Sequence, residues 1–377
     1  MIVCVRTWQV VCRESSESAE AFAAFKSARY WPVLDGLRAV SVVLVLAVHT
    51  HDPMWQIING SLGVTLFFVI SGFLITTLLI REEGNYGRVS ISRFYIRRFF
   101  RIVPLYFVAL GVFTMLVLMF QQGSGTSGYL DRLPLLSTFN GDLAGSGTFS
   151  HSWSLGIEEK FYFLWPIAAF GISLCRCYRL PVLQVLVLLA AVASFIPGLG
   201  YFGIYLPILG GCLVAILAHS RATFALLYGL SGRNASFFCF AFLVLFLFTD
   251  KLLPFDESSR YAHTVFAVAA ILFLPALLLS NFRIGKFLSN PILVHVGIRA
   301  YAVYLFHPLC LELVDKVAAP GSESILMQLV RFLALVISSL LISEVLARAV
   351  ERPGISLGRR LIASMPRREA SSAEVDR

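Results

Sequence analysis

Long apolar segments follow one another along most of this chain, and they limit its possible folds more than any other feature. The first begins near Leu34, and most reach the roughly 17–25 residues that an α-helix needs to cross a bilayer. Hydrophobic residues fill 58% of the 377 positions and charged residues 14%, whereas soluble domains have about 45–50% and about 25%. The sequence therefore predicts an all-α integral membrane protein, a bundle of about ten transmembrane helices. Their expected ranges are 34–51, 61–80, 102–120, 158–174, 181–197, 201–219, 235–249, 261–280, 294–315 and 325–347.

The middle of this series is less regular than its ends. Only residues 197–200 (PGLG) separate the fifth segment from the sixth, which predicts a tight helical hairpin or one broken helix. The seventh segment is short enough for a re-entrant helix. No internal repeat or inverted symmetry relates the two halves of the sequence.

The basic residues orient the bundle. With the N-terminus inside, 25 of the 31 lysines and arginines fall in inner segments and 5 in outer loops, as the positive-inside rule requires. This bias predicts that both termini are cytoplasmic. We expect a cytoplasmic N-terminal tail at 1–29 with a short surface helix, a transmembrane domain at 30–352 and a cytoplasmic C-terminal tail at 353–377. Arg331 lies inside the tenth segment, where its side chain can snorkel to the interface.

The first apolar segment carries ionisable residues, which are costly inside a membrane and therefore point to function. Arg38 and His49 are eleven residues apart, so at ~100° per residue they project within about 20° of the same direction. At ~1.5 Å per residue they lie about 16 Å apart along the helix. Asp35 falls near the same stripe. Either Arg38 contacts lipid phosphates and His49 marks the outer end, or the two line one path.

A second cationic group precedes the third segment. Arg98 and Arg101 are three residues apart and share a helix face among aromatic residues. Such a cluster at the inner surface can bind lipid phosphates or the phosphates of a nucleotide-like donor, and spacing does not decide between them. In the second segment, Ser71 and Gly72 predict close helix packing.

Polar residues also gather toward the outer side. Glu158 and Glu159 begin the fourth segment, and because neighbours on a helix diverge by ~100°, we expect only one to face a given site. Acids in a first turn also complement the helix dipole. The Gly- and Ser-rich stretch 121–149 is expected to cover an outward cleft. His307 follows Tyr301 and Tyr304 in a polar stripe at the depth of His49, which also fits a polar packing seam.

In this order, the motifs resemble the acyltransferase-3 family of polytopic membrane acyltransferases, which includes O-antigen and exopolysaccharide acetylases. The resemblance covers about residues 30–363 and is closest to the stand-alone type without a fused esterase-like domain. It rests on the Arg38-to-His49 spacing and on residues 34–39, 63–76, 94–106, 153–162, 301–308 and 351–353.

The resemblance implies transfer of an acyl group, usually acetyl, from cytoplasmic acyl-CoA to a sugar hydroxyl. The acceptor would be a lipopolysaccharide, exopolysaccharide or other envelope glycan at the outer face of a bacterial inner membrane. Carried over, the family's Arg-to-His pair is Arg38 with His49, and its Arg-x-x-Arg motif is Arg98 with Arg101.

Chemistry then gives each candidate a role. The arginines, with Asp35 beside Arg38, would hold the donor's phosphates. His49 would act as general base or as transient acyl carrier, and Glu158 or Glu159 would orient the imidazole or the sugar. His307 is a second candidate near the acceptor. The seven cysteines lack metal-site spacing, so no metal is expected, and nothing indicates nucleic-acid binding.

The sequence can also be compared with two other classes of membrane protein. A secondary transporter or lipid-linked sugar exporter also fits ten helices with buried charges, but the absence of inverted repeats argues against it. A receptor or scaffold would leave the buried arginines and histidines unexplained. Dependence of product formation on acyl-CoA would separate the enzyme from the transporter.

Overall fold

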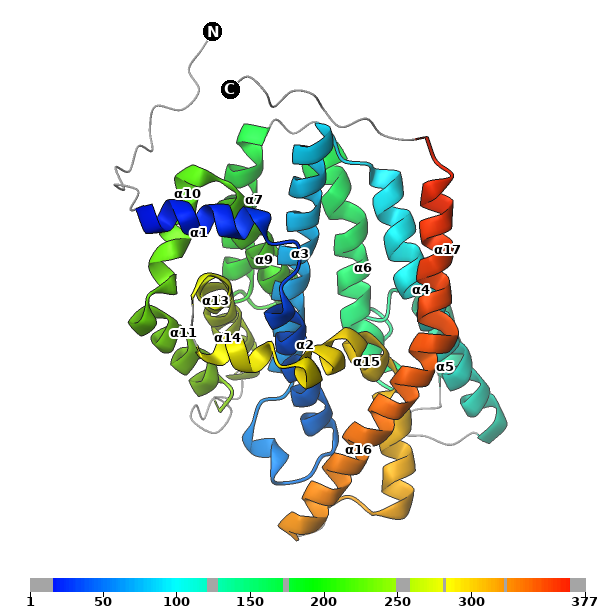
Figure 1. Cartoon of the computed structure of the whole chain (residues 1–377). Helices are drawn as coiled ribbons and strands as arrows, with labels where there is room; N and C mark the ends of the chain where they lie inside the picture. The colour runs from blue at the N-terminus through cyan, green and yellow to red at the C-terminus, as the bar shows by residue number, and fades with distance from the viewer. Residues whose placement is uncertain are drawn as a thin grey trace.

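The computed structural model describes residues 16–120, 128–171, 176–248, 258–280, 283–321 and 324–366, and all regular elements within these ranges are helical (Figure 1). The α-helices are α1 (Ser16–Ser27), α2 (Pro32–His49), α3 (Leu62–Tyr86), α4 (Ile91–Phe120), α5 (Tyr129–Ser137), α6 (Trp153–Pro166), α7 (Arg176–Ala193), α8 (Gly200–Gly203), α9 (Leu206–His219), α10 (Arg221–Tyr228), α11 (Arg233–Phe246), α13 (Ser258–Leu279), α14 (Arg283–Leu288), α15 (Pro291–Val317), α16 (Ile325–Leu346) and α17 (Arg352–Ala363). Short 3-10 turns occupy Trp55–Ile57, Ser150–Ser152 and Gly229–Ser231, and π-helical turns occupy Ile167–Gly171 and Ala347–Glu351.

The predicted apolar segments all coincide with helices. In the described part of the chain, 7 of them are long and apolar enough to cross a membrane, or 8 if the bent pair α10–α11 is one span. The two others are α6, which continues into a π-helical turn, and α7, which is apolar but shorter. The protein is thus an all-α, multi-pass membrane protein, and the count of ten spans stays a prediction.

The irregular middle of the chain takes the form that its composition indicates. α7 and α9 are separate helices that pack against each other, with the short α8 between them. α10 and α11 are bent by 75° at a short break, which makes them either a broken span or a re-entrant loop.

Two ends of the bundle are named here after the predicted orientation. The inner end carries α1 and the connection from α3 to α4, and the outer end carries the connection from α2 to α3. The last turns of α17 lie at the same end as α1 (Figure 1), as the prediction of two termini on one side requires. Which side faces the cytoplasm stays a prediction.

Residues 353–363, predicted as the start of a cytoplasmic tail, form α17 and pack along α4. Two glycines allow this contact. A Cβ at Gly354 would lie 2.7 Å from the carbonyl oxygen of Phe100, and one at Gly358 would lie 2.9 Å from the Phe100 Cβ. The tail therefore begins as a helix held against the bundle.

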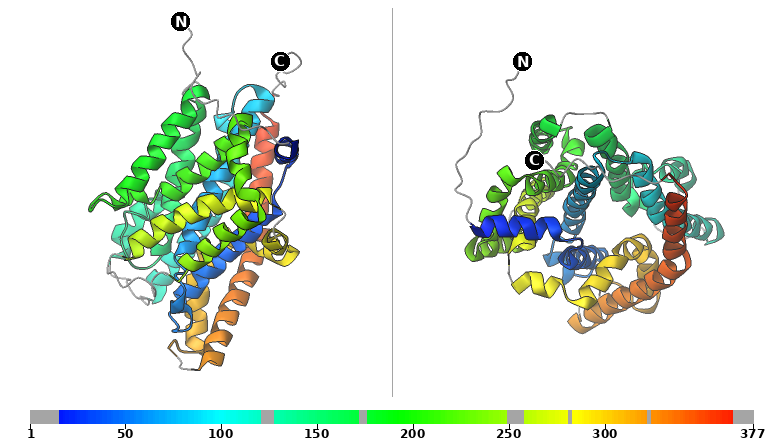
Figure 2. Two further views of the ribbon diagram at one scale, coloured as in Figure 1. Left: turned by 90° about the vertical axis from the view of Figure 1, so that its left-hand side faces the viewer. Right: turned by 45° about the horizontal axis from the view of Figure 1, so that its top comes forward.

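Helices α2 and α3 are the most buried spans, and two turned views show them surrounded by other helices (Figure 2). On one side α2 crosses α15 at Gly297, where a Cβ would lie 1.7 Å from the carbonyl oxygen of Asp35. On the other side α3 crosses α9 at Gly72, where a Cβ would lie 1.9 Å from the carbonyl oxygen of Ile208. The predicted packing role of Gly72 is confirmed, and the first crossing places the polar residues of α2 next to those of α15.

Replacement of Gly72 by alanine is expected to destabilise the bundle by about 1–3 kcal/mol or more, because the new methyl group would overlap backbone atoms that cannot rotate away. Thermal unfolding in detergent measures the effect. The matched control is Gly111→Ala on α4, where no atom lies within 4 Å of the new Cβ. Equal melting temperatures for the two variants would contradict the tight crossing.

Candidate active site

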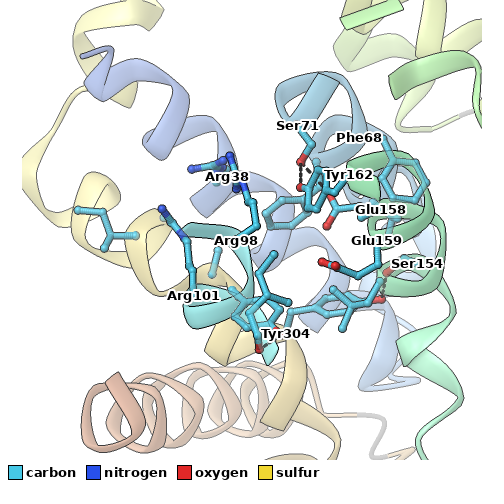
Figure 3. Close-up of a pocket in the computed structure, with 18 residues that line it drawn as sticks. Arg38, Phe68, Ser71, Arg98, Arg101, Ser154, Glu158, Glu159, Tyr162 and Tyr304 are labelled. Atoms are coloured by element: carbon cyan, nitrogen blue, oxygen red, sulfur yellow. Dashed lines mark hydrogen bonds between the residues drawn. The ribbon is translucent and has the colours of Figure 1, made fainter. Parts of the chain in front are cut away.

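A cavity of about 100 Å³ lies where α2, α3, α4, α6 and α15 meet, and we call it the central cavity (Figure 3). Its polar lining consists of Arg38, Ser71, Arg98, Arg101, Ser154, Glu158, Glu159, Tyr162, Tyr301 and Tyr304. The structure thus brings together three arginines and two carboxyl groups that the sequence singled out on three different segments. Because three positive groups face two carboxyl groups, the cavity is cationic in any protonation state of the acids.

Arg38 is held in place by its own helix. Its guanidinium donates to Asp35 Oδ1 at 3.0 Å, and Asp35 accepts a second hydrogen bond of 2.6 Å from the Tyr30 hydroxyl. Asp35 does not line the central cavity. Asp35 therefore contributes to the predicted donor site only indirectly, through its hydrogen bond to Arg38.

Arg98 and Arg101 have no ion-pair or hydrogen-bond partner among the described residues. Arg98 lies over the rings of Phe94 and Tyr162, with 5.8 Å and 5.2 Å between the guanidinium carbon and the ring centroids. Both arginines also border a second cavity of about 540 Å³ at the inner end, here called the inner cavity. Its other cationic residues are Arg81, Arg93, Arg97 and Arg359.

Both adjacent carboxylates line the central cavity, so the expectation that only one would face a given site is wrong (Figure 3). Glu158 accepts a 2.6 Å hydrogen bond from the Ser71 hydroxyl, which itself accepts one of 3.1 Å from Tyr162. The prediction failed because it considered only the directions of the two Cα–Cβ bonds. A glutamate side chain is long enough for two neighbours to converge on one cavity across a ~100° arc.

Three histidines form a cluster near the outer end. The ring centroids of His49 and His307 are 4.7 Å apart, and those of His307 and His151 are 5.4 Å apart. His49 and His151 line a third cavity of about 350 Å³, here called the outer cavity, together with Asp142, Ser150 and Trp153. His307 is fully buried and packs behind the other two rings.

Backbone carbonyl groups set the tautomer of each imidazole, because a carbonyl can only accept. His49 Nδ1 donates to the Val45 oxygen at 2.7 Å, and His307 Nδ1 donates to the Tyr304 oxygen at 2.7 Å. Each therefore has its lone pair on Nε2 when neutral. The carboxylates of the central cavity do not contact His49, so the backbone of α2, not Glu158 or Glu159, holds this ring.

His151 belongs to the site although its position in the sequence gave it no assigned role. Its Nε2 donates to the Leu305 oxygen at 3.1 Å, and its ring packs against Phe149. Burial lowers the pKa of His151 from 6.5 to about 3, so this imidazole is neutral at physiological pH. The position of His151 beside His307 depends on its contact with α15, which lies far away in the sequence, so the local sequence gave no signal for it.

A hydrogen-bonded layer separates the central cavity from the outer cavity. The Tyr304 hydroxyl donates to the His151 carbonyl oxygen at 2.7 Å and accepts from the Ser154 hydroxyl at 2.8 Å. Tyr304 and Ser154 line the central cavity, whereas His151 lines the outer one. Arg38 and His49, predicted to share one path, therefore border different cavities in this conformation.

The loop before α6 lines the outer cavity in its described part, and its predicted place over a cleft that faces outward stays a prediction. Gly141, Asp142 and Gly145 line the cavity. Asp142 is anchored by Lys160 of α6, with both carboxylate oxygens within 2.7 Å of the ammonium nitrogen. Residues 121–127 of the predicted cover lie outside the described residues.

No group of three or more His, Cys, Asp or Glu side chains in the described ranges is arranged to hold a metal ion.

Comparison with known proteins gives a consistent picture. A family model described as an acyltransferase domain matches residues 31–348. A Staphylococcus aureus protein named "Putative O-acetyltransferase" is 28% identical over 76% of this chain and 52% of its own length. A Bacillus subtilis protein named "Putative peptidoglycan O-acetyltransferase" is 29% identical over 74% of this chain and 48% of its own. An O-acetyltransferase of Staphylococcus aureus is 26% identical over 92% and 61%.

The chain spans about half the length of the first two of these relatives. No solved structure matches it.

Proposed function

The chain belongs to the acyltransferase-3 family, and from this premise we propose that it is a membrane O-acyltransferase. It moves an acyl group, in the simplest case acetyl, from acyl-CoA at the inner end to a sugar hydroxyl of an envelope glycan at the outer end. The membrane would be a bacterial inner membrane. Relatives named for O-acetyl transfer, one of them to peptidoglycan, support the acetyl group and the glycan class of acceptor.

One observation carries the donor side of this proposal: Arg98 and Arg101 form a wall that the inner and central cavities share. The inner cavity is open to the side from which CoA would come, and its further arginines suit a phosphate-rich ligand. Among described residues Arg98 and Arg101 lack anionic partners, so a bound phosphate would supply the missing countercharge. A lipid phosphate would satisfy the inner cavity but would not require a cationic central cavity behind it.

The central cavity then receives the end of the pantetheine arm with the thioester, and at about 100 Å³ it must widen to hold them. His49 lies about 16 Å beyond Arg38 along α2, a distance that an extended arm spans. The layer of Tyr304, Ser154 and His151 must open for the thioester to reach His49. It is held by two hydroxyl hydrogen bonds, which a rotation of the Tyr304 side chain would break.

His49 is the proposed general base. Its Nε2 takes the proton of the acceptor hydroxyl while the hydroxyl oxygen attacks the thioester carbonyl carbon. The new C–O bond forms, the C–S bond breaks, and the departing CoA thiolate takes the proton from His49. The hydrogen bond from Nδ1 to Val45 supports this role, because it leaves the Nε2 lone pair free in the neutral ring.

Glu158 and Glu159 are assigned to the donor side, since they line the central cavity and lie within electrostatic range of Arg98. Their charges lower the net positive charge around the donor's phosphates, and the imidazole of His49 is held by Val45. His307 is assigned a positioning role, because it is buried against His49 and does not face the acceptor.

The donor assignment is tested by Arg98→Gln and Arg101→Gln. Each charge-assisted contact to a phosphate contributes about 1.5–3 kcal/mol, so each change should raise the KM for acetyl-CoA about tenfold or more. The measurement is transfer of labelled acetyl from acetyl-CoA in inverted membrane vesicles.

Arg348→Gln is the matched control, because Arg348 is exposed and borders neither cavity. Its KM for acetyl-CoA should equal that of the unmodified chain. An unchanged KM in the variant that carries both cavity substitutions would exclude the donor assignment.

A further inference from the structure

A fourth cavity, of about 500 Å³, lies between α3, α6, α9 and α13 at the outer end, and we call it the side cavity. Its polar lining is Ser61, Thr65, Trp153, Ser194, Tyr201, His263 and Thr264. Trp153 borders both this cavity and the outer cavity that contains His49. The indole ring of Trp153 thus forms part of the wall between the side cavity and the outer cavity.

The hydrogen bonds at its wall form a chain with one direction. Ser61 donates to Asn59 Oδ1, so its oxygen must accept from His263 Nε2 at 3.2 Å. With its proton on Nε2, the His263 ring accepts at Nδ1 from the Thr65 hydroxyl, also at 3.2 Å. The proton of Thr65 is therefore already donated to His263, and its oxygen retains lone pairs.

Other hydroxyls of the wall are oriented in the same way. Ser194 donates to the Ala190 carbonyl oxygen at 3.0 Å, and Tyr201 donates to Asp142 at 2.5 Å. Neither hydroxyl has a proton left to give. The Ser194 oxygen can still accept a hydrogen bond, and the Tyr201 oxygen, which already accepts from the Lys160 ammonium group at 3.4 Å, retains one lone pair. The wall formed by Thr65, Ser194 and Tyr201 therefore favours a ligand rich in hydrogen-bond donors.

The cavity also discriminates by charge. No Lys, Arg, Asp or Glu lines it among the described residues, whereas the central cavity has three arginines. Acceptor oxygens without a cation disfavour a phosphate or a carboxylate. Trp153 is 36% exposed and offers an aromatic face, on which the C–H face of a sugar ring can pack. Its volume lies in the range of about 300–1,000 Å³ typical of small-molecule sites.

We propose that the side cavity is the acceptor subsite and binds a neutral sugar residue through its hydroxyl protons. The sugar packs on Trp153 and directs one hydroxyl around the indole toward His49. The role of acceptor rests on the proposed function, whereas the binding of a sugar in this cavity does not depend on acyl transfer.

Direct binding tests it with the full chain in nanodiscs and three oligosaccharides of equal length: chitotriose, maltotriose and the anionic trigalacturonate. At least one neutral trisaccharide should bind, and trigalacturonate should bind at least tenfold more weakly. Thr65→Val removes the acceptor oxygen at nearly constant volume and should raise the Kd for the neutral sugar about three- to tenfold. Thr65→Ser, which retains the oxygen, should bind the neutral sugar with the Kd of the unmodified chain.

Thr77→Val is the matched control on the same helix. Thr77 is buried, its hydroxyl has no hydrogen-bond partner among the residues that the structure describes, and it lies about 18 Å from Thr65 along α3. Its Kd should be unchanged. Equal binding of trigalacturonate, no binding of either neutral sugar, or equal effects of Thr65→Val and Thr77→Val would each overturn the proposal.

Acyl transfer provides an independent readout. With the bound neutral sugar as acceptor, Thr65→Val should raise the KM for the sugar and leave the KM for acetyl-CoA unchanged. If the sugar binds with the expected pattern but receives no acetyl, the proposed function fails and the subsite stands. If acetyl is transferred and Thr65→Val changes neither Kd nor KM, the subsite fails and the function stands.

Discussion

Replacement of His49 by alanine is expected to lower the rate of acetyl transfer by about 10²–10⁴-fold, the usual contribution of a positioned general base. The expectation follows from its place at the outer cavity and from its hydrogen bond to Val45, which leaves Nε2 free to accept a proton. The rate is measured as labelled acetyl incorporated into envelope glycans by membranes that contain equal amounts of folded protein. Mass spectrometry of the same glycans identifies the group transferred.

His219→Ala is the matched control. Like His49, His219 lies at the end of its helix and hydrogen-bonds through Nδ1 to the carbonyl oxygen four residues earlier, at 2.8 Å. It lines none of the four cavities described above. Its replacement should leave the rate per folded molecule unchanged. Full activity in His49→Ala would remove the catalytic assignment.

The same experiment separates a general base from an acyl carrier. If His49 carried the acyl group, the unmodified protein incubated with labelled acetyl-CoA and no acceptor would retain hydroxylamine-sensitive label. As a general base, it should retain none.

Helical periodicity explains why part of this site could be predicted from the sequence. Periodicity gives the direction of a side chain and its depth along one helix. That information was enough to place His307 at the depth of His49, and their rings lie 4.7 Å apart. It was also enough to place Arg98 and Arg101 on one face, where both border the same two cavities.

Periodicity does not predict which other helix packs against a given helix face. The contact of α2 with α15 depends on the absence of a side chain at Gly297, far away in the sequence from Asp35. The layer that places Arg38 and His49 at different cavities includes a hydrogen bond from Tyr304 of α15 to the His151 carbonyl oxygen. Such contacts between remote segments are outside the reach of spacing rules.

The fold, like the site, was predicted from the sequence only in part. Apolar length located the helices, because each must satisfy its backbone groups inside a bilayer. The arginines after residue 347 indicated a solvated tail, but the chain continues through a π-helical turn into α17. Gly354 and Gly358 make that continuation possible by allowing α17 to pack on Phe100, a contact that charge patterning does not reveal.

Arg331 gives the second large expected effect, and it corrects one expectation. The side chain was expected to snorkel to the interface, yet Arg331 is only 1% exposed. It forms ion pairs with Asp52, which is completely buried, and with Asp315, and its Nε donates to the Ala318 carbonyl oxygen at 2.9 Å. The two carboxylates attract the guanidinium inward, so it does not reach the lipid headgroups.

Arg331→Met is expected to reduce the free energy of unfolding by about 3–5 kcal/mol, because it leaves the Asp52 carboxylate buried without a countercharge. Denaturant titration in mixed micelles measures this loss. Arg348→Met serves as the control, since the Arg348 side chain is 69% exposed and its ion pair faces solvent. It should leave the unfolding midpoint almost unchanged.

The double variant Asp52→Asn, Arg331→Met distinguishes an unpaired charge from a loss of packing. If the buried carboxylate causes the damage, removing its charge should recover most of the stability lost in Arg331→Met. If the arginine stabilises through its stem alone, the double variant should be no more stable than the single one. Because Asp52 lies three residues after His49, the single variant should also lower the rate of acetyl transfer, and the double variant should recover part of it.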